Sequence, residues 1–426
     1  MQRDRYGNAL ATDSAVAAAA YDAGVDHILE GSAGGAEAFA QAIAEDEGFA
    51  LAHIGAARAA MYAGDMAAAQ AALAQAQRRV AGASEREQAH VAIYGLLLSG
   101  KPVQARAAVE AHVRDYPRDA IIAQLCTNIL GLIAMSGAPG REAALLAYTG
   151  SLLPHYGDDW WMMSMHALSL CEVGATDASL ELMEAALERN NGNANGSHFK
   201  AHALYEQGRT VEGRTYLDAW MVGFKPEAVL HGHLSWHQAL WALEQGDEDA
   251  MWAHYRGAIA PGSGFALPIN TVSDAAALLW RAELAGFDVP REDWQRLSAY
   301  ATRYFPDPGQ SFADYHTSLA HAMAGDGAAL ARIAEASKGF AADLVAPVAR
   351  AWGAVAREDF EGALAALTPV MADHARLGGS RAQRDLLELT WLLCLMRTGA
   401  RDEAARAIAT RRPVFAQGAP VQGFAA

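Results

Sequence analysis

The chain has 426 residues, of which 52% are hydrophobic, and its mean hydropathy is close to zero. Its formal charge of −16 repels phosphate backbones, which argues against a nucleic-acid partner. Its most apolar stretches are too short to cross a bilayer, which argues against a membrane protein.

The start of the chain and its cysteines bear on the cellular compartment. The first twenty residues contain several charges and no apolar segment of the kind that forms a signal peptide. The three cysteines lie far apart in apolar text, so we expect buried thiols in a reducing compartment rather than disulfides or a zinc site. They are Cys126, Cys171 and Cys394. We therefore predict a cytoplasmic protein.

No feature of the sequence marks a domain boundary. The sequence is rich in alanine and poor in β-branched residues throughout, and no Pro- or Ser-rich linker interrupts it. Such a composition favours helix throughout. We predict one all-α domain over residues 1–426.

One sequence pattern recurs along the chain: an apolar helix, a glycine with a charged residue nearby, and a second Ala-rich helix. It is clear in AARAAMYAGDMAAAQAAL around Gly64, in HALYEQGRTVEGRTYL around Gly208 and in HQALWALEQGDEDAMWAHY around Gly246. In chain order the turns fall at Gly64, Gly100, Gly137, Gly174, Gly208, Gly246, Gly286, Gly325 and Gly399, with Arg357–Asp359 taking the place of a glycine between the last two.

The spacing of these turn glycines indicates a repeat. Most intervals are 34 to 40 residues, the period of tetratricopeptide repeats with some longer loops. Glycine suits the turn because the chain leaves the first helix of each pair, helix A, through a left-handed residue. Each pair then buries its apolar face on its neighbours, so the sequence predicts a tetratricopeptide-like α-solenoid, a superhelix of about ten helix pairs.

Counting back from each turn glycine at about 100° per residue sorts the side chains of helix A between two faces. Positions 4, 8 and 11 before the glycine hold the packing residues, and positions 6, 10 and 13 point into the hollow of the superhelix. His53, His166 and His321 fall 11, 8 and 4 residues before their glycines. We therefore expect these three to be core histidines.

A second set of residues falls on the inner face, and its five histidines come from three repeats in one stretch of the chain. The inner face of any solenoid is polar, but this concentration favours a binding site. The set is His198, His202, His233, Trp236, His237, Trp280 and His316, with Asp274 and Arg281 at its edge and Gln124, Thr127, Asn128 and Trp161 upstream.

Five stretches of the sequence carry a family resemblance: SHFKAHALYEQGR (197–209), HLSWHQALWALEQG (233–246), SDAAALLWRAELAG (273–286), FADYHTSLA (312–320) and LGGSRAQRDLL (377–387). With them the chain resembles the tetratricopeptide repeat protein 38 family over nearly its whole length. The resemblance implies the fold but no settled reaction. One departure is NNGNANGS before His198, which indicates an irregular turn. The resemblance points to His198, His202, His233, Trp236, His237, Asp274, Arg281, Asp314, His316, Gln383, Arg384 and Asp385.

Two pairs of histidines, His198 with His202 and His233 with His237, have the i, i+4 spacing that lets two imidazoles share a metal ion. Neither pair has the glutamate of a metalloprotease motif or a third carboxylate ligand within its helix. We predict no cofactor, and keep these four histidines as candidates for a divalent metal.

Acid–base chemistry is the other option for the inner face. Asp274 with Arg281, and Asp314 with His316, offer acid, base and anion-binding groups. Asp314 has a competing role, since Ser311-x-x-Asp314 matches a helix-capping pair.

A second capping pair lies at the entrance to the last helix A. Ser380-x-x-Gln383 matches a capping box, and we predict that role for Gln383. Arg384 and Asp385 follow directly and either reach the hollow or pair with each other.

Three functions remain open. The sequence favours binding of a small, partly aromatic or amphipathic molecule, because the inner face has many imidazoles and indoles and few cations. The second is an enzyme at the same residues, with His237, His316 and Asp274 as catalytic candidates. The third is a scaffold that binds a short peptide, the commonest use of these repeats. The sequence does not determine the oligomeric state.

Overall fold

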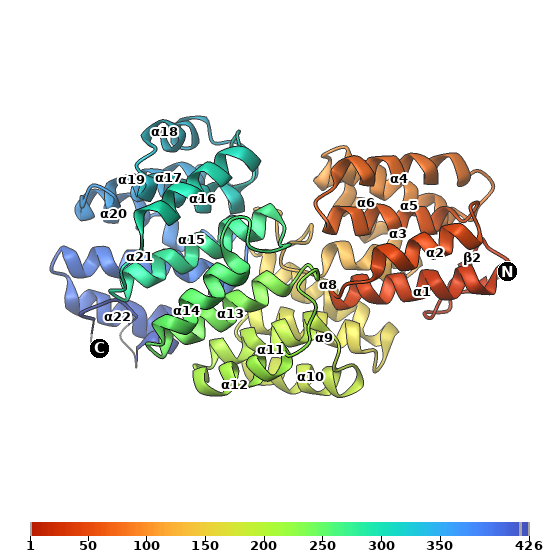
Figure 1. Cartoon of the computed structure of the whole chain (residues 1–426), viewed down its shortest axis with the longest axis horizontal. Helices are drawn as coiled ribbons and strands as arrows, with labels where there is room; N and C mark the ends of the chain where they lie inside the picture. The colour runs from red at the N-terminus through yellow and green to blue at the C-terminus, as the bar shows by residue number, and fades with distance from the viewer. Residues whose placement is uncertain (1, 417–419, 425–426) are drawn as a thin grey trace. The chain divides into compact units, whose positions relative to one another are not determined.

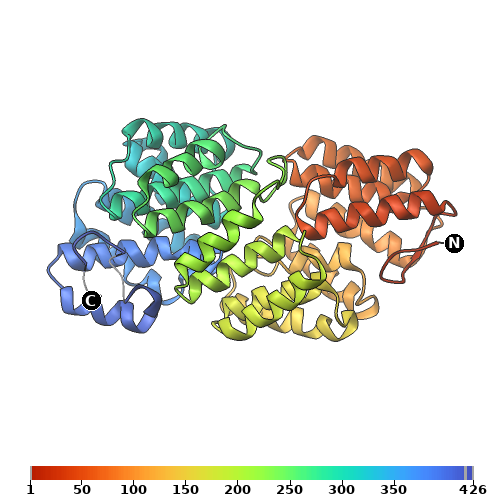
Figure 2. The ribbon, with the colours of Figure 1, turned by 60° about the horizontal axis from the view of Figure 1, so that its bottom comes forward.

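The computed structural model of the chain describes residues 2–416 and 420–424, which contain 22 α-helices and two short β-strands. The backbone packs into two compact units, each described by itself (Figures 1 and 2). Unit 1 consists of residues 1–134, 142–200 and 227–230, and unit 2 of residues 135–141, 201–226 and 231–426. The prediction of a tetratricopeptide-like α-solenoid is confirmed, and that of a single domain stays a prediction.

Unit 1 is a stack of helical hairpins that follows a two-stranded antiparallel hairpin. Consecutive helices such as α3 and α4, or α9 and α10, pack against each other. Its elements are β1 (Gln2–Arg3), β2 (Ala9–Leu10), α1 (Ala15–Glu30), α2 (Gly35–Glu45), α3 (Ala50–Tyr62), α4 (Met66–Arg79), α5 (Glu85–Leu98), α6 (Pro102–Asp115), α7 (Ala120–Ala123), the 3₁₀ turn η1 (Gln124–Cys126), α8 (Arg141–Tyr156), α9 (Trp160–Glu172), α10 (Thr176–Arg189) and the first half of α11 (Ala194–Glu206).

Unit 2 begins within α11 and continues the same pattern. Here too each helix pairs with the next, as α19 does with α20. Its elements are α12 (Thr210–Trp220), α13 (His231–Glu244), α14 (Glu248–His254), the π-helical turn η2 (Tyr255–Ile259), α15 (Pro268–Leu284), α16 (Arg291–Tyr304), α17 (Ser311–Ala324), α18 (Gly327–Ala336), α19 (Ala342–Val355), α20 (Phe360–Leu367), η3 (Val370–Ala372), η4 (His374–Leu377), α21 (Arg381–Arg397), α22 (Arg401–Arg411) and η5 (Pro413–Phe415).

Every predicted turn glycine has a positive φ, between 64° and 88°, in the left-handed region. At the position without a glycine, Glu358 takes the same conformation with a φ of 60°. It is the one non-glycine residue with a positive φ within residues 2–416 and 420–424. The repeat therefore requires a left-handed turn, and an L-residue there costs about 1–2 kcal/mol.

Where an aspartate follows the left-handed turn residue, it caps the next helix. Asp65, Asp247, Asp326 and Asp359 each accept a hydrogen bond from the backbone N–H three residues later, at 2.9 to 3.1 Å. Such a cap satisfies one of the open donors at a helix start and contributes about 1 kcal/mol. A left-handed residue followed by an aspartate thus ends one helix and begins the next.

Helix A of each pair in unit 2 is almost completely buried. On α13 every residue from Gly232 to Leu243 is buried, and α15, α17 and α21 are similar. Trp236, Trp241 and Trp352 are among the largest fully buried side chains. Since these helices are covered on all sides, polar side chains on them face the interior of the unit.

The segment before Gly137 is less helical than the repeat pattern indicates. Beyond η1 it runs through turns, and the N–H of Leu132 bonds back to the carbonyl oxygen of Leu125 at 2.8 Å. Asn128 and Gly131 have low helix propensity, which favours the turns over a continuous helix A.

The irregular turn expected before His198 is present only at residues 190–193. Helix α11 begins at Ala194, so the asparagine- and glycine-rich stretch is partly helical. The side chain of Asn193 explains this start, because its Oδ1 accepts the N–H of Gly196 at 3.0 Å as an N-cap does.

The three cysteines are buried and form no disulfide with one another, as expected. Burial raises the pKa of Cys126 and of Cys394 to about 12. These thiols are therefore packing residues. Within the described part of the chain, no helix is both long and apolar enough to span a membrane.

Candidate functional site

The predicted site residues lie on helix A of five pairs between α11 and α21. All are buried, with exposed fractions of 0 to 6%. A buried polar group costs about 1–3 kcal/mol unless it is hydrogen-bonded, so each needs a partner. They are His198 and His202 on α11; His233, Trp236 and His237 on α13; Asp274, Trp280 and Arg281 on α15; Asp314 and His316 on α17; and Arg384 and Asp385 on α21.

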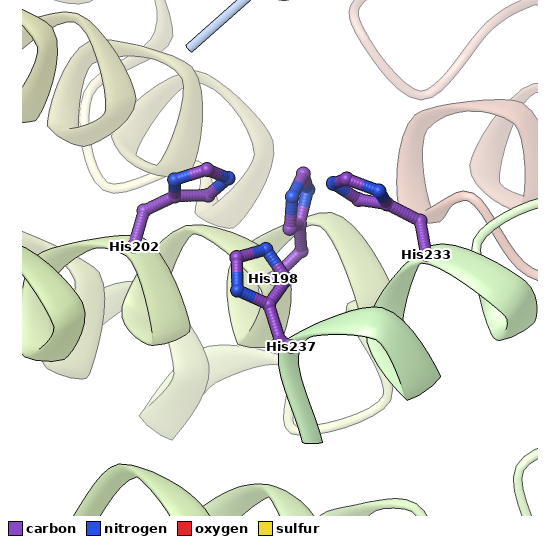
Figure 3. Close-up of side chains that lie close together, drawn as sticks. All are labelled: His198, His202, His233 and His237. Atoms are coloured by element: carbon purple, nitrogen blue, oxygen red, sulfur yellow. The ribbon is translucent and has the colours of Figure 1, made fainter. Parts of the chain in front are cut away.

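Four imidazoles from α11 and α13 converge, and we call them the imidazole cluster: His198, His202, His233 and His237 (Figure 3). One nitrogen of each lies within 4.8 Å of the others. The ring centroids of His202 and His237 are 4.6 Å apart, and those of His233 and His237 are 5.1 Å apart. The boundary between the units falls inside α11, after Lys200, so His198 is one helical turn away from the part of the cluster in unit 2.

A carboxylate orients one member of the cluster. The Nδ1 of His233 lies 2.8 Å from Oδ2 of Asp274 on α15, and both side chains are buried. Since the carboxylate accepts, Nδ1 of the neutral ring carries the proton and Nε2 keeps its lone pair. Asp274 therefore fixes the tautomer of His233.

The environment of the cluster keeps two of its rings, those of His202 and His237, neutral. Burial, with smaller contributions from neighbouring imidazoles, lowers the pKa of His202 to about 3 and that of His237 well below its usual range. Neutral imidazole is the form that accepts hydrogen bonds and binds metals.

An aromatic wall borders the cluster on α13. The indole of Trp236 stacks on His233 with centroids 5.2 Å apart and meets His237 edge-on at 5.0 Å. The guanidinium of Arg281 lies 5.9 Å from the centre of the same indole. The indole Nε1 has no hydrogen-bond partner among the described residues.

Arg281 joins the cluster to a buried polar network. It donates to Tyr205 OH at 2.9 Å, and Tyr205 in turn donates to Oδ2 of Asp385 at 2.9 Å. Arg412 donates to the same carboxylate at 2.8 Å. Sequence analysis missed Tyr205 and Arg412; Tyr205 follows His202 by three residues, a spacing that places both on one side of α11.

His316 lies on α17, with its ring 3.9 Å from that of Tyr315. Its Nδ1 donates to the carbonyl oxygen of Phe312 at 2.7 Å, so Nε2 of the neutral ring is an acceptor. Burial lowers the pKa of His316 to about 3. Neither His316 Nε2 nor Tyr315 OH has a hydrogen-bond partner among the described residues.

Three predicted residues line two other cavities of unit 2. Trp280, whose Nε1 donates to Thr390 at 2.9 Å, lines a cavity of about 390 Å³. Arg384 and Asp385 line one of about 240 Å³ together with His374 and further arginines. No member of the imidazole cluster lines either of these cavities, as far as the described residues show.

The two predicted capping residues act at helix starts. Gln383 forms a capping box with Ser380, which confirms that prediction. Asp314 does not pair with Ser311; its Oδ2 accepts the N–H of Gly309 at 2.8 Å. Burial raises the pKa of Asp314 to about 6.

Three histidines predicted to be core residues each have a hydrogen-bond partner. His53 lies 3.1 Å from the carbonyl oxygen of Glu47, His166 lies 3.0 Å from Oγ1 of Thr149, and His321 lies 2.8 Å from Oγ of Ser298. The prediction is confirmed for His53 and His321, which are buried, whereas His166 is only half-buried.

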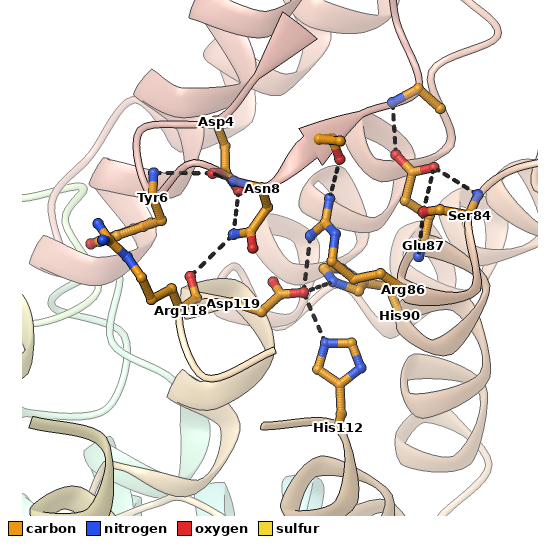
Figure 4. A network of polar contacts seen from close by, with 12 residues as sticks. Asp4, Tyr6, Asn8, Ser84, Arg86, Glu87, His90, His112, Arg118 and Asp119 are labelled. Atoms are coloured by element: carbon orange, nitrogen blue, oxygen red, sulfur yellow. Dashed lines mark hydrogen bonds and ion pairs between the residues drawn. The ribbon is translucent and has the colours of Figure 1, made fainter. Parts of the chain in front are cut away.

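Unit 1 contains a second histidine group that sequence analysis missed, the Asp119 cluster of Arg86, His90, His112 and Asp119 (Figure 4). Oδ2 of Asp119 lies 2.9 Å from Arg86, 2.6 Å from His90 and 2.8 Å from His112. These neighbours hold the pKa of Asp119 well below its usual value. His90 lies ten residues before Gly100, the position that His198 has before Gly208. Counting back from the turn glycine therefore places His90 on the inner face as well.

No family model matches the chain. A crystal structure of yeast Tom70 is similar with a TM-score of 0.38 and 13% identity, over 90% of this chain and 83% of that one. A structure of Naa15/Naa10 bound to HypK-THB has a TM-score of 0.22 and 13% identity, over 95% of this chain and 64% of that one. At these values neither likeness bears on function, and the resemblance to the tetratricopeptide repeat protein 38 family stays a prediction.

Proposed function

We propose that unit 2 binds a small molecule among Trp236, Arg281, Tyr315 and His316. The supporting observation is that Trp236 Nε1, Arg281 Nε, Tyr315 OH and His316 Nε2 are buried without a hydrogen-bond partner among the described residues. Two contacts pair these residues: Arg281 lies 5.9 Å from the centre of the Trp236 indole, and the rings of Tyr315 and His316 lie 3.9 Å apart. A ligand that hydrogen-bonds to these atoms offsets about 1–3 kcal/mol for each.

The four atoms define the chemistry of the ligand. The indole N–H and the guanidinium N–H donate, His316 Nε2 accepts, and the tyrosine hydroxyl does either. A carboxylate suits Arg281, a hydroxyl or amine suits His316, and an aromatic ring suits the neighbouring indole and phenol. The proposed ligand is therefore a small aromatic acid that also carries a hydrogen-bond donor.

Calorimetry on the full chain tests this with 4-hydroxyphenylacetate and, as a control ligand, its uncharged amide. The acid should bind and the amide should bind more weakly. Arg281→Lys should weaken binding of the acid about tenfold, because the ammonium group of lysine cannot form the two parallel hydrogen bonds that a guanidinium gives a carboxylate. Trp294→Phe is a matched control, since Trp294 is a buried indole of unit 2 whose Nε1 already donates to Glu283. Equal binding by parent and Arg281→Lys contradicts the proposal.

The alternative is an enzyme at the same residues. The observation that favours it is the unprotonated Nε2 of His316, with the His233–Asp274 pair as a second group able to handle a proton. The catalytic candidates are then His237, His316 and Asp274. The peptide-scaffold function comes first if variants at all of these residues bind and react like the parent.

A further inference from the structure

The imidazole cluster is the larger of the two groups of potential metal ligands within the described residues. His198 and His202 come from successive turns of α11, and His233 and His237 from successive turns of α13. Two i, i+4 pairs thus bring four nitrogens to one place, as Figure 3 shows.

The spacing is close to that of a tetrahedral site. Four nitrogens about 2.1 Å from a zinc ion lie about 3.4 Å from one another, so atoms now within 4.8 Å need to move by little more than 1 Å. The ring of His237 stands at 78° to that of His202 and at 80° to that of His233. The edges of these rings therefore approach from different directions, as a tetrahedral ion requires.

The second feature is the carboxylate behind His233. Metal-bound histidines generally donate their other N–H to a carboxylate or carbonyl, which fixes the tautomer and makes the ring a better ligand. Asp274 accepts from Nδ1 of His233 at 2.8 Å and leaves Nε2 to face the cluster. A buried histidine that serves only packing does not need an anion in this position.

The Asp119 cluster shows the opposite arrangement. There both imidazoles turn Nε2 toward Asp119, at 2.6 and 2.8 Å, so Nε2 of each carries a proton. Arg86 already supplies the positive charge next to the carboxylate. Those nitrogens are therefore not available to a metal.

We propose that the imidazole cluster binds one divalent first-row transition metal ion, with Zn²⁺ as the best fit, through His198, His202, His233 and His237, and that Asp274 positions His233. Imidazole nitrogens suit zinc, copper, iron and nickel, and four of them in a tetrahedral arrangement favour zinc. The metal proposal does not depend on whether a small molecule binds beside Trp236.

The test is titration of the full chain, freed of metal by a chelator, with Zn²⁺ and with Co²⁺ as a coloured probe. We expect one ion per chain and the intense visible absorption of tetrahedral Co²⁺ bound to nitrogen, which Zn²⁺ displaces. Failure to bind either ion, or weak absorption typical of an octahedral aqua complex, overturns the proposal.

Variants separate positioning from ligation and from folding. Asp274→Asn keeps all four imidazoles and should weaken Co²⁺ binding about 10- to 100-fold. His237→Ala removes a ligand and should weaken it further. His112→Gln is the matched control, a buried histidine of the Asp119 cluster, and should bind Co²⁺ like the parent. Unchanged Co²⁺ binding in Asp274→Asn and His237→Ala, or an equal loss in His112→Gln, overturns the assignment.

A measurement on the parent alone covers the case in which the histidine variants fail to fold. X-ray absorption of the Zn²⁺-loaded chain should show nitrogen neighbours at about 2.0 Å with the outer-shell pattern of several imidazoles. A coordination shell of oxygen alone rejects the site.

Discussion

The two histidine clusters consist of imidazoles that are equally buried, but the hydrogen-bond partners of these imidazoles differ. In the Asp119 cluster one carboxylate accepts from an arginine and two imidazoles, so the buried charge has its partner within the chain. In the imidazole cluster four imidazoles face one another, and the carboxylate of Asp274 lies behind His233.

The difference teaches how to separate a structural histidine from a functional one. Both groups qualify as potential metal sites by residue type and spacing. The position of the ring proton distinguishes the two clusters. A nitrogen that donates to a carboxylate cannot bind a metal, whereas the other nitrogen of the same ring can. By this criterion the two Nε2 atoms that face Asp119 are occupied, whereas the proposed metal site uses nitrogens that do not donate to Asp274.

The largest expected effect is the loss of the shared carboxylate in unit 1. Asp119→Ala leaves Arg86 buried without its anion and should lower the free energy of unfolding by about 3–5 kcal/mol. Urea denaturation followed by circular dichroism measures this. Asp115→Ala, at an exposed position near the end of α6, should change it by no more than about 0.5 kcal/mol. Similar values for both variants would mean that the Asp119 cluster is not structural.

Metal should act on one cluster alone. At 100 times its dissociation constant, Zn²⁺ should stabilise the parent chain by about 2.7 kcal/mol, and removal with a chelator should reverse the effect. Asp119→Ala should retain the Zn²⁺-dependent part of its stability, and His237→Ala should lose it. Thermal unfolding with and without Zn²⁺ decides this, and the reverse pattern would contradict the contrast between the clusters.

Glutamine substitutions separate binding from catalysis in unit 2. His237→Gln and His316→Gln keep a polar group but remove an imidazole, whose ring nitrogens can accept and donate a proton. A binding protein should keep its affinity for 4-hydroxyphenylacetate within about tenfold, or 1.4 kcal/mol. An enzyme should lose about 10²-fold in turnover while still binding. Calorimetry and a turnover assay on the same variants distinguish these outcomes.

The neutral state of buried His316 should affect how stability changes with pH. The folded pKa of His316 is about 3, below the unfolded value of 6.5, so unfolded chains bind protons more readily in this range. Its contribution to stability is complete above pH 6.5 and is lost as the pH falls toward 3, at up to about 1.4 kcal/mol per pH unit. With a chelator present, His316→Gln should therefore show a smaller loss between about pH 6.5 and pH 5.5 than the parent does. An identical slope in urea denaturation would show that His316 is not held neutral.

The fold was predictable because it follows from local rules. The turn glycines adopt the left-handed conformation that their spacing required, and Glu358 adopts it where a glycine was missing. The segment after Cys126 was not predictable from the glycine spacing alone, since Gly137 keeps its positive φ although the residues before it are largely turns.

The candidate site was predictable only in part, because the helical register gives the face of a residue but not its partner. The register brought His202, His237 and Trp236 together. It also places Tyr205 on the same side of α11 as His202, but the contacts of Tyr205 and Arg412 with Asp385 are tertiary and no spacing encodes them. The register also placed Trp280 with this set, but its ring lines a different cavity. The Asp119 cluster joins α5, α6 and the residue before α7, so no single helix displays it.

The smallest expected effect comes from a backbone position outside both clusters and gives the baseline for the comparison. Glu358 has a φ of 60°, which an L-residue adopts at a cost and glycine adopts freely. Glu358→Gly should therefore raise the free energy of unfolding by about 0.5–1 kcal/mol, the relief of strain being partly offset by the greater freedom of glycine in the unfolded chain. Gly246→Ala, at the same place in another repeat, should lower it by a similar amount. Neither change touches an imidazole, so both should leave the affinity for Co²⁺ unchanged. If Co²⁺ affinity instead follows stability in these two variants, then the losses expected for His237→Ala report global stability rather than a ligand, and the contrast between the clusters fails.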